Sequence, residues 1–372
     1  MFMAKKILFF HFDLGNGGAE RVLVNLANAL DKDKYDITVK TLFNYGVNKN
    51  LLNSNIRRQW VFDFAPISGI NKLLTLFPPE LLHRLFIKDK YDYEIAYLEG
   101  SAARIVSGCK NPSAKIFAWI HVEITNLKKY FSSFRSLNEA SICYHSFNKI
   151  ACVSENTKTS FIEKTGWHDM NVQVVHNVID IDEILNKAKN EIPISLSSNV
   201  INLCSVGRLN NQKGYDRLIT VLSRLHQQGF NDWHLYLLGK GEDLDQLKQM
   251  AVGGGISDNI SFLGFIQKPY EYISKMDMFV CSSRFEGYST AVTEAILLGV
   301  PVITTDCSGM KEILGNDYPG IFSNDEQGIY DALLKVLSEA DFKTTLKSMC
   351  GERASLFSTK KLVNEFESFI NE

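Results

Sequence analysis

The chain has 372 residues, 45% of them hydrophobic and 22% charged, with a formal net charge of −2 at pH 7. This length favours two domains with buried cores, and the weak negative charge argues against broad binding to nucleic acid, which usually needs a basic surface. No stretch approaches the roughly 18 apolar residues that cross a bilayer, so no membrane-spanning helix is predicted.

The seven cysteines are scattered, and no two form a C-x-x-C pair. This spacing indicates neither a disulfide framework nor a zinc site, and it fits a reducing cytoplasm. The N-terminal "MFMAKKILFFHFD" has a short apolar run without a small-residue cleavage site, and Asp13 follows at once. We therefore interpret it as a buried first strand rather than a signal peptide.

Apolar runs alternate with amphipathic stretches through the first half of the chain. Residues 19–30 place Val22, Leu23, Leu26, Ala27 and Leu30 on one face of a predicted helix. Strands that are buried on both faces, with helices between them, are typical of parallel βαβ units. The predicted strands cover residues 5–12, 35–43, 93–98, 115–121 and 149–154.

A second series of the same kind follows a polar stretch, residues 186–198, which we interpret as a linker. Helices are predicted at residues 215–229 and in the amphipathic tail from 355. The fold class is therefore α/β, with two Rossmann-like doubly wound domains and a ligand cleft at the carboxyl ends of both sheets. The strands of this series are predicted at 200–207, 233–239, 259–264, 276–282 and 301–305.

The turn "GNGGAER" (15–21) lies between the first predicted strand and the first helix. Gly17 and Gly18 would let the backbone approach an anion at the helix N-terminus. A dinucleotide fingerprint would need glycine where Glu20 stands, so NAD binding is disfavoured. A purely structural tight turn remains the alternative.

The stretch "VGRLNNQKG" (206–214) follows the first strand of the second series. Gly207 and Arg208 lie at the strand end, with Lys213 just before a helix. Arginine can bind a diphosphate through two hydrogen bonds, and lysine adds a mobile point charge. The order of residues is not that of a P-loop, and surface ion pairs are the alternative.

Two glutamates eight positions apart bound the stretch "EGYSTAVTE" (286–294). The backbone amides of Gly287–Thr290 are expected at a helix N-terminus, between Glu286 and Glu294. Glu294 would reach two vicinal hydroxyls, and a capping box is excluded because residue 291 is alanine. A serine-hydrolase elbow is excluded too, because all eight histidines precede Ser289.

His121 ends the strand at 115–121, where a histidine facing the cleft is either structural or functional, and Glu123 follows it. Three D-x-D strings are short enough to arise by chance, and no H-E-x-x-H is present, so no metal site is predicted. Residues 71–91 and 126–137 interleave leucine and phenylalanine with basic side chains. Such segments either lie in a membrane interface or pack as ordinary helices.

Together these motifs, and above all "EGYSTAVTE" followed by "EAILLGVPVITTDCSG", resemble the retaining glycosyltransferases of family four, which have the GT-B fold. The resemblance implies an acceptor-binding domain at 1–185, a donor-binding domain at 199–355, and a C-terminal helix at 356–372 that crosses back to the first domain. It also implies a cytoplasmic enzyme of capsule or lipopolysaccharide synthesis, peripheral to the inner face of the membrane.

The resemblance further implies roles for individual residues. Arg208 and Lys213 match the pair that holds the donor diphosphate, Glu294 the acid on the ribose and Glu286 the acid beside the donor sugar. His121 matches a histidine beside the reacting sugar. The other donor contacts that it implies are Gly17, Gly18, Gly207, Gly287, Tyr288, Ser289 and Thr290.

The function expected from this is metal-independent, retaining transfer of a hexose or N-acetylhexosamine from a UDP-sugar to a glycan acceptor, most simply a lipid-linked one. Positive charge and a helix N-terminus would stabilise the departing diphosphate without a cation or other cofactor. The alternatives are a nucleotide-sugar epimerase or phosphorylase, and a non-catalytic nucleotide-sugar binding module, on the same fold.

Overall fold

The computed structural model describes residues 4–196 and 199–372. The chain divides into a first domain, Met1–Ile179 with Thr359–Glu372, and a second domain, Asp180–Ser358. The division falls before the predicted linker because helix α8 (Ile181–Lys187) packs on α11 and α12 of the second domain. Residues 197 and 198 of that linker lie outside the described residues.

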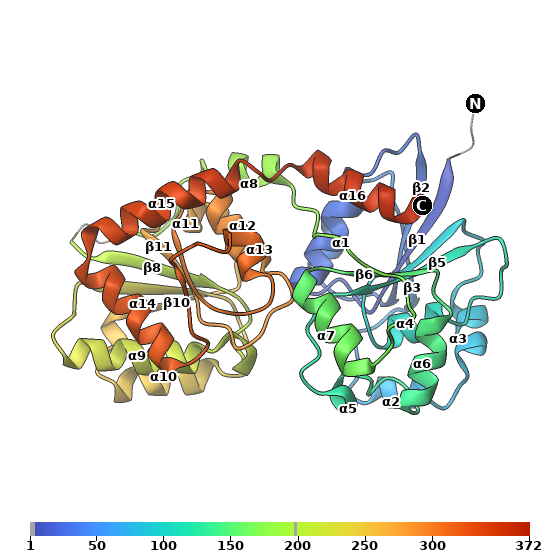
Figure 1. Ribbon diagram of the computed structural model, residues 1–372, viewed down its shortest axis with the longest axis horizontal. Helices are drawn as coiled ribbons and strands as arrows, with labels where there is room; N and C mark the ends of the chain where they lie inside the picture. Colours follow the sequence, from blue (N-terminus) through green and yellow to red (C-terminus); the bar gives the residue numbers. More distant parts are fainter. Residues whose placement is uncertain (1–3, 197–198) are drawn as a thin grey trace. The chain divides into compact units, whose positions relative to one another are not determined.

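The first domain contains a seven-stranded sheet in the order β3-β2-β1-β4-β5-β6-β7, and every neighbouring pair is parallel (Figure 1). Parallel strands need crossover connections, and helices supply most of them. The strands are β1 (Lys5–His11), β2 (Tyr35–Phe43), β3 (Arg57–Phe62), β4 (Tyr93–Ala96), β5 (Lys115–Ile120), β6 (Lys149–Cys152) and β7 (Val172–Val174).

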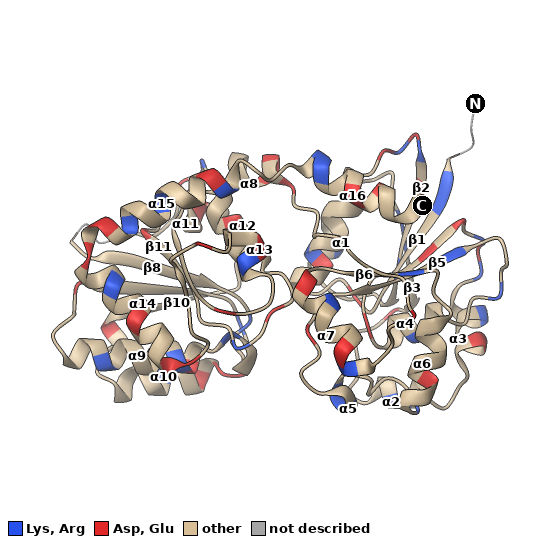
Figure 2. Ribbon diagram, viewed as in Figure 1, with Lys and Arg blue, Asp and Glu red and all other residues tan. Residues whose placement is uncertain are grey.

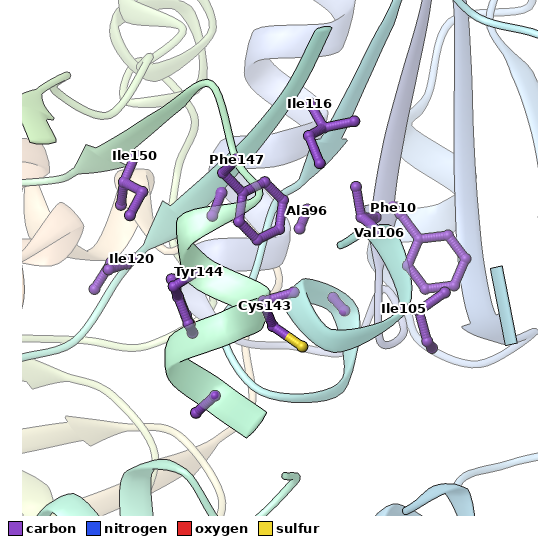
Figure 3. Packing of buried hydrophobic residues seen from close by; sticks show 14 of the residues in the cluster. Phe10, Ala96, Ile105, Val106, Ile116, Ile120, Cys143, Tyr144, Phe147 and Ile150 are labelled. Atoms are coloured by element: carbon purple, nitrogen blue, oxygen red, sulfur yellow. The ribbon is translucent and has the colours of Figure 1, made fainter. Parts of the chain in front are cut away.

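Helices cover both faces of this sheet, which is why its central strands are largely apolar. Leu8 and Phe10 of β1 join a buried cluster with residues of α4 and α6, such as Ile105 and Tyr144 (Figure 3). Phe9 points to the other face, where its ring lies 5.9 Å from that of Phe366 in α16. Successive residues of a strand therefore serve two separate cores.

The C-terminal helix belongs to the first domain and closes one of these cores. Leu362, Phe366, Phe369 and Ile370 are buried, and the ring of Phe369 lies 5.4 Å from that of Trp119 in β5. Figure 1 shows α16 beside α1, on the side of the sheet opposite α4 and α6. The helices of this domain are α1 (Gly18–Ala29), α2 (Ile70–Leu74), α3 (Pro79–Phe86), α4 (Ser101–Val106), α5 (Leu127–Tyr130), α6 (Leu137–His145), α7 (Glu155–Thr165) and α16 (Thr359–Asn371), with a 3-10 turn, η1 (Asn48–Leu51).

The second domain repeats the design with six parallel strands in the order β10-β9-β8-β11-β12-β13. Its strands are β8 (Ile201–Val206), β9 (Trp233–Leu238), β10 (Ile260–Gly264), β11 (Met278–Cys281), β12 (Val302–Thr305) and β13 (Ile321–Phe322). Besides α8, its helices are α9 (Tyr215–Gln227), α10 (Leu244–Gly253), α11 (Tyr270–Ile273), α12 (Thr290–Leu297), α13 (Met310–Leu314), α14 (Glu326–Ser338) and α15 (Ala340–Ala354), with turns η2 (Asn211–Lys213) and η3 (Ser257–Asn259).

In both sheets the strand order reverses direction once, between β1 and β4 and between β8 and β11. At such a switch point the connections leave toward opposite faces, and this opens a crevice at the carboxyl edge where ligands bind. The α/β class with two Rossmann-like doubly wound domains is thus confirmed. Within the described residues, no helix is both long and apolar enough to cross a membrane.

Candidate functional site

The switch point of the second sheet brings together two predicted residues that are 73 positions apart. Lys213, at the end of η2, contacts Glu286 across a distance of 2.5 Å between Nζ and Oε1. Burial opposes the charged ammonium, but the adjacent Glu286 carboxylate outweighs it and raises the pKa of Lys213 well above its usual range. Ser283 donates a second hydrogen bond to the same carboxylate oxygen, at 2.6 Å. The lysine is therefore charged, and its pair with Glu286 is held in one geometry.

The turn that carries Glu286 is fixed by hydrogen bonds to its backbone. Arg217 donates to the carbonyl of Ser282 at 2.7 Å, and Thr305 donates to the carbonyl of Ser283 at 2.6 Å. The neighbouring Arg284 binds Asp216 of α9 through two hydrogen bonds of 2.7 and 2.6 Å. A paired guanidinium and carboxylate set orientation as well as distance, so the turn is preorganised.

Two glycines allow other segments to pack directly on this turn. Gly214 has a φ of +64°, and a Cβ there would lie 2.2 Å from the carbonyl oxygen of Ser282. Gly309 has a φ of +77°, and a Cβ would lie 2.8 Å from the carbonyl oxygen of Gly287. Both positions require glycine, because a side chain would be strained and would collide with backbone.

Helix α12 begins at Thr290, directly after the turn. Ser289 is its N-cap, and its hydroxyl accepts a hydrogen bond from the amide of Val292 at 3.4 Å. Tyr288 and Ser289 are buried at 8% and 4% exposure, while Glu294, in the second turn, is partly exposed. The first turn of α12 contains no acidic residue, so its positive end is not neutralised from within the helix.

Arg208 follows β8 at the same edge of the sheet. Its side chain is exposed and makes no hydrogen bond or ion pair with any residue that the structure describes. Gly207 packs closely under the lysine, since a Cβ there would lie 3.0 Å from Cε of Lys213. The edge thus holds one cation paired with Glu286 and another that is open to a ligand.

The switch point of the first sheet holds two buried histidines. His121 follows β5 and is 8% exposed, and its ring centroid lies 5.0 Å from that of Tyr97. Burial lowers the pKa of His121 to about 3, with a further contribution from His11, whose pKa burial lowers to about 4. Both rings are neutral at pH 7, and Nε2 of each has no hydrogen-bond partner among the described residues.

Glu99 belongs to the same group, although the sequence analysis did not single it out. It lies three residues after β4, and its Oε2 accepts a hydrogen bond from the backbone amide of His121 at 3.1 Å. Burial raises the pKa of Glu99 to about 7 despite two backbone hydrogen bonds that favour the charged form. The signal that could have found it is its place in the β4–α4 loop, at the predicted ligand edge.

The glycine turn after β1 is held by hydrogen bonds to residues that follow β2. Leu14 donates its amide to the carbonyl of Tyr45 at 3.0 Å, and the Asn48 side chain donates to the carbonyl of Gly15. Gly17 is the N-cap of α1 and has no side-chain cap, and Gly18 begins the helix. The carboxylate of Glu20 folds over the turn, 2.3 Å from where a Gly17 Cβ would lie. A phosphate at this turn would have to displace it, so a donor contact at Gly17 and Gly18 stays a prediction.

Each D-x-D string contains an aspartate next to a helix end. Asp180 caps α8 by accepting from the amide of Glu183 at 2.9 Å, and Asp243 is the N-cap of α10. Asp31 accepts from the amide of Asp33 at 2.9 Å in the turn after α1. Glu123 is partly buried beyond β5, and a role for it stays a prediction. The structure thus brings Gly207, Lys213, Glu286 and Gly287 together in the second domain. It groups His121 with Glu99 in the first.

Both halves of the chain match models of glycosyltransferase families. Residues 16–183 match the model of glycosyltransferase family 4, and residues 186–355 match the model of glycosyl transferases group 1. The chain is 26% identical over 387 residues to an N-acetylgalactosaminyltransferase of Campylobacter jejuni, named for an N-acetylgalactosamine-N,N'-diacetylbacillosaminyl-diphospho-undecaprenol acceptor. That match covers 97% of this chain and 98% of the relative.

Two further matches are informative. The lipopolysaccharide core biosynthesis glycosyltransferase LpsE of Rhizobium meliloti is 23% identical, over 92% of this chain and 91% of the relative. The crystal structure of Anabaena HepE in complex with UDP and glucose superposes with a TM-score of 0.75 at 18% identity, covering 98% of this chain and 99% of that one. At that identity the structural match establishes the GT-B fold and nothing finer.

Proposed function

The chain is a glycosyltransferase that carries both domains of the GT-B fold, and we propose that it is a metal-independent, retaining enzyme. It would move a hexose or N-acetylhexosamine from a UDP-sugar to a lipid-linked glycan in the synthesis of a surface polysaccharide. The observation that carries the proposal is the group of Lys213, Glu286 and Arg208 beside the N-terminus of α12. The donor class is supported by the UDP that HepE binds, and the acceptor class by the diphospho-undecaprenol in the name of the Campylobacter relative.

In the proposed reaction, the bond between the anomeric carbon and the donor phosphate oxygen breaks, and a bond to the acceptor oxygen forms on the same face. Negative charge develops on the departing diphosphate, where Arg208, Lys213 and the amides of Gly287–Thr290 would stabilise it. The departing phosphate oxygen takes the acceptor proton. No carboxylate nucleophile and no metal ion are needed in this scheme.

The pairing of Lys213 with Glu286 gives the ligand-free site a defined starting point. A donor phosphate would replace the carboxylate on Lys213, and Glu286 would then accept hydrogen bonds from sugar hydroxyls. This exchange keeps Lys213 paired with an anion and Glu286 supplied with hydrogen-bond donors, which matters because a buried charge without partners costs several kcal/mol. Glu294, one turn further along α12, would bind the ribose hydroxyls.

The first domain would supply neutral contacts. Because His121 is uncharged at pH 7 and its buried Nε2 has no partner in the described structure, this nitrogen is our candidate for a hydrogen bond to a sugar hydroxyl. Burial raises the pKa of Glu99 to about 7, and this side chain is our candidate for the contact with the acceptor hydroxyl. Both groups would select for hydroxyls rather than for charge.

Contact with a membrane is part of the proposal and rests on one end of the first domain. Leu73, Leu76 and Phe77 are 52%, 68% and 44% exposed, and Lys128 and Lys129 on α5 are exposed as well. Figure 1 shows α2, α5 and α6 at this end, and the blue ribbon in Figure 2 marks basic residues on α5. Exposed apolar groups beside lysines suit the interface of an anionic bilayer, and the cytoplasmic face is where we place it.

Arg135 connects the two predicted membrane segments. Its guanidinium donates to the backbone carbonyls of Thr75 at 2.5 Å and Leu76 at 3.0 Å. Arg135 therefore shapes this surface, and the lysines of α5 are the cations that it leaves open to lipid.

Three measurements together test the function. A thermal-shift series with UDP-, GDP- and ADP-sugars should show selective stabilisation by one UDP-sugar, because stabilisation grows with ligand concentration over Kd. NMR of the product should show the anomeric configuration of the donor retained, and an inverted linkage would contradict the mechanism. Incubation without acceptor should leave the donor sugar unchanged, whereas an epimerase would convert it. A binding module would bind the donor but transfer nothing.

A further inference from the structure

Three side chains of types that bind metal ions converge in the first domain, away from the residues assigned above. His83 lies on α3, Glu94 is the second residue of β4, and Cys109 follows α4. Nε2 of His83 lies 2.6 Å from Oε2 of Glu94, and Sγ of Cys109 lies 3.6 Å from Oε1 of the same carboxylate. One ligand atom from each residue lies within 4.8 Å of the other two.

Glu94 is the unusual member of this group. Its side chain is buried, at 1% exposure for the residue, in a central strand where its neighbours on the flanking strands are Leu8 and Ile116. No lysine or arginine forms an ion pair with it among the described residues. A buried carboxylate is costly unless a cation or hydrogen-bond donors satisfy it, and its two partners are both potential metal ligands.

We propose that His83, Glu94 and Cys109 form a binding site for a divalent transition-metal ion, Zn²⁺ above all. Imidazole nitrogen, carboxylate oxygen and thiolate sulfur are the three protein donors that Zn²⁺ takes. Three ligands from the chain leave a fourth position for water or a small ligand. The inference does not depend on the proposed function, because none of these three residues is assigned to the donor or the acceptor.

The distances suit such an ion. Zinc bonds of about 2.0–2.3 Å in a tetrahedron place ligand atoms roughly 3.3–3.7 Å apart. Sγ of Cys109 and Oε1 of Glu94 already have this separation, at 3.6 Å. His83 and Glu94, at 2.6 Å, would move apart by less than about 1 Å as the metal takes the place of the proton between them.

The backbone around the site is packed, yet the site has a route to solvent. A Cβ at Gly108 would lie 2.2 Å from the carbonyl oxygen of Pro79, so the segment with Cys109 rests directly on the start of α3. A cavity of about 660 Å³ is lined by His83, Glu94 and Gly108, among others. Of the seven cysteines, Cys109 alone is not buried. A preformed set of ligands with an entry path is what a metal site requires.

The test uses the full chain, free of affinity tags, reduced and stripped of metal with a chelator. Titration with Co²⁺, a spectroscopic stand-in for Zn²⁺, should give one ion per chain and a sulfur-to-cobalt charge-transfer band in the near ultraviolet. Zn²⁺ should then displace the cobalt and abolish the band. Because the other six cysteines are buried in the folded protein, this band identifies Cys109 without any mutation.

Variants locate the other ligands. Cys109→Ser should lose the band, and both Cys109→Ser and His83→Gln should weaken Zn²⁺ binding at least about 100-fold in competition with a chromophoric chelator, since even outer-shell changes cost 10–100-fold. The matched control is His145→Gln, because His145 also contacts a carboxylate, Asp169 at 3.3 Å, but without a cysteine. It should bind Zn²⁺ as the unmodified chain does.

Two results would overturn the inference. One is the absence of a stoichiometric cobalt band in the unmodified chain, which would leave a buried histidine–glutamate pair and no metal site. The other is zinc affinity that is equal in Cys109→Ser, His83→Gln and His145→Gln, which would place the metal elsewhere. Either result leaves the proposed glycosyl transfer untouched, since that is measured with the donor sugar.

Discussion

The carboxyl edges of the two sheets have the same topology but differ in their charges. The edge of the second domain is charged, and most of its charges are paired: Lys213 with Glu286, and Arg284 with Asp216, while Arg208 is open to a ligand. The edge of the first domain keeps His121 and His11 neutral at pH 7 by burial, and burial also raises the pKa of its Glu99 to about 7, so that this carboxyl is only partly charged there. A doubly wound sheet thus places a site without deciding what it binds, and the loop residues decide that. The charged edge fits a diphosphate and the neutral edge fits sugar hydroxyls.

The surfaces of the two domains differ as well. Most of the large apolar side chains that are exposed in the described structure belong to the first domain, among them Leu76 at 68% and Ile142 at 65%. The second domain contributes Leu185, Val252 and Leu356. If the first domain receives a lipid-linked acceptor, an apolar surface on that domain is where it is needed.

The largest effect should come from removing the charge of Lys213. In Lys213→Met we expect kcat/KM to fall by about 10³-fold and donor stabilisation in thermal shift to disappear, because a single donor to developing charge contributes 10²–10³ and Glu286 is left unpaired. The control is Lys311→Met, which removes an exposed lysine paired with Asp306. Equal donor binding by both variants would show that the charged edge does not hold the diphosphate.

The next largest effect should be on membrane binding, which we expect to depend on the first domain and not on the second. The double change Lys128→Gln with Lys129→Gln should weaken co-sedimentation with anionic vesicles about 30-fold, since each lysine near such a surface contributes about 1 kcal/mol. Leu76→Ser should weaken it about tenfold through lost apolar burial. Val252→Ser is the matched control in the second domain, at 67% exposure. If Val252→Ser reduced vesicle binding as much as Leu76→Ser does, the first domain would not be the part of the protein that contacts the membrane.

Substitution of His121, at the edge of the first domain, should have a smaller effect on kcat/KM. His121→Ala should reduce kcat/KM about tenfold, the value of one hydrogen bond to a neutral hydroxyl, while stabilisation of the protein by UDP alone stays unchanged. His121→Asn, which keeps a neutral polar group, should recover part of the activity. If UDP binding fell together with turnover, the histidine would be acting on the donor phosphates instead.

The smallest effect concerns stability and pH. Because burial raises the pKa of Glu99 to about 7 from an ordinary 4.5, the folded chain keeps a proton that the unfolded chain loses between these pH values. The free energy of unfolding contributed by Glu99 therefore falls as pH rises from about 4.5 to 7, by about 1–3 kcal/mol. Glu99→Gln should remove this slope, as followed by urea unfolding at pH 5 and pH 8.

His121 supplies the opposite sign in part of the same window. Its pKa is lowered to about 3, so its contribution is present above the ordinary value of 6.5 and is lost as pH falls below it. His121→Asn should therefore make the protein less sensitive to acid. If the free energy of unfolding of Glu99→Gln had the same pH slope as that of the unmodified chain, the Glu99 carboxyl would have an ordinary pKa.

The fold was largely predictable because most strands are buried on both faces. The runs at 5–12, 35–43 and 115–121 correspond to β1, β2 and β5 within one residue at each end. Strands β3, β7 and β13 were missed for a physical reason. Strand β3 lies at the edge of its sheet with no fully buried residue, and β7 and β13 have only three and two residues, so none of them shows an apolar run.

The site was predictable only where one motif contains it. The stretch at 286–294 predicted a helix N-terminus between two glutamates, and α12 begins at Thr290. The ion pair between Glu286 and Lys213 joins two separate motifs, and it depends on the packing of β11 beside β8. Glu99 and the group of His83, Glu94 and Cys109 were missed because their chemistry arises from burial and long-range packing, which leave no local pattern.

The position of α16 has a consequence for how the chain folds as it is made. Phe366 and Phe369 complete a core whose other members, Phe9 and Trp119, are synthesised hundreds of residues earlier. The first domain therefore lacks part of the cover of one sheet face until α16 has been synthesised. The second domain has all of its residues between Asp180 and Ser358 and can finish first. We therefore expect the first domain to complete its core after the second, although N-terminal domains generally fold first during synthesis.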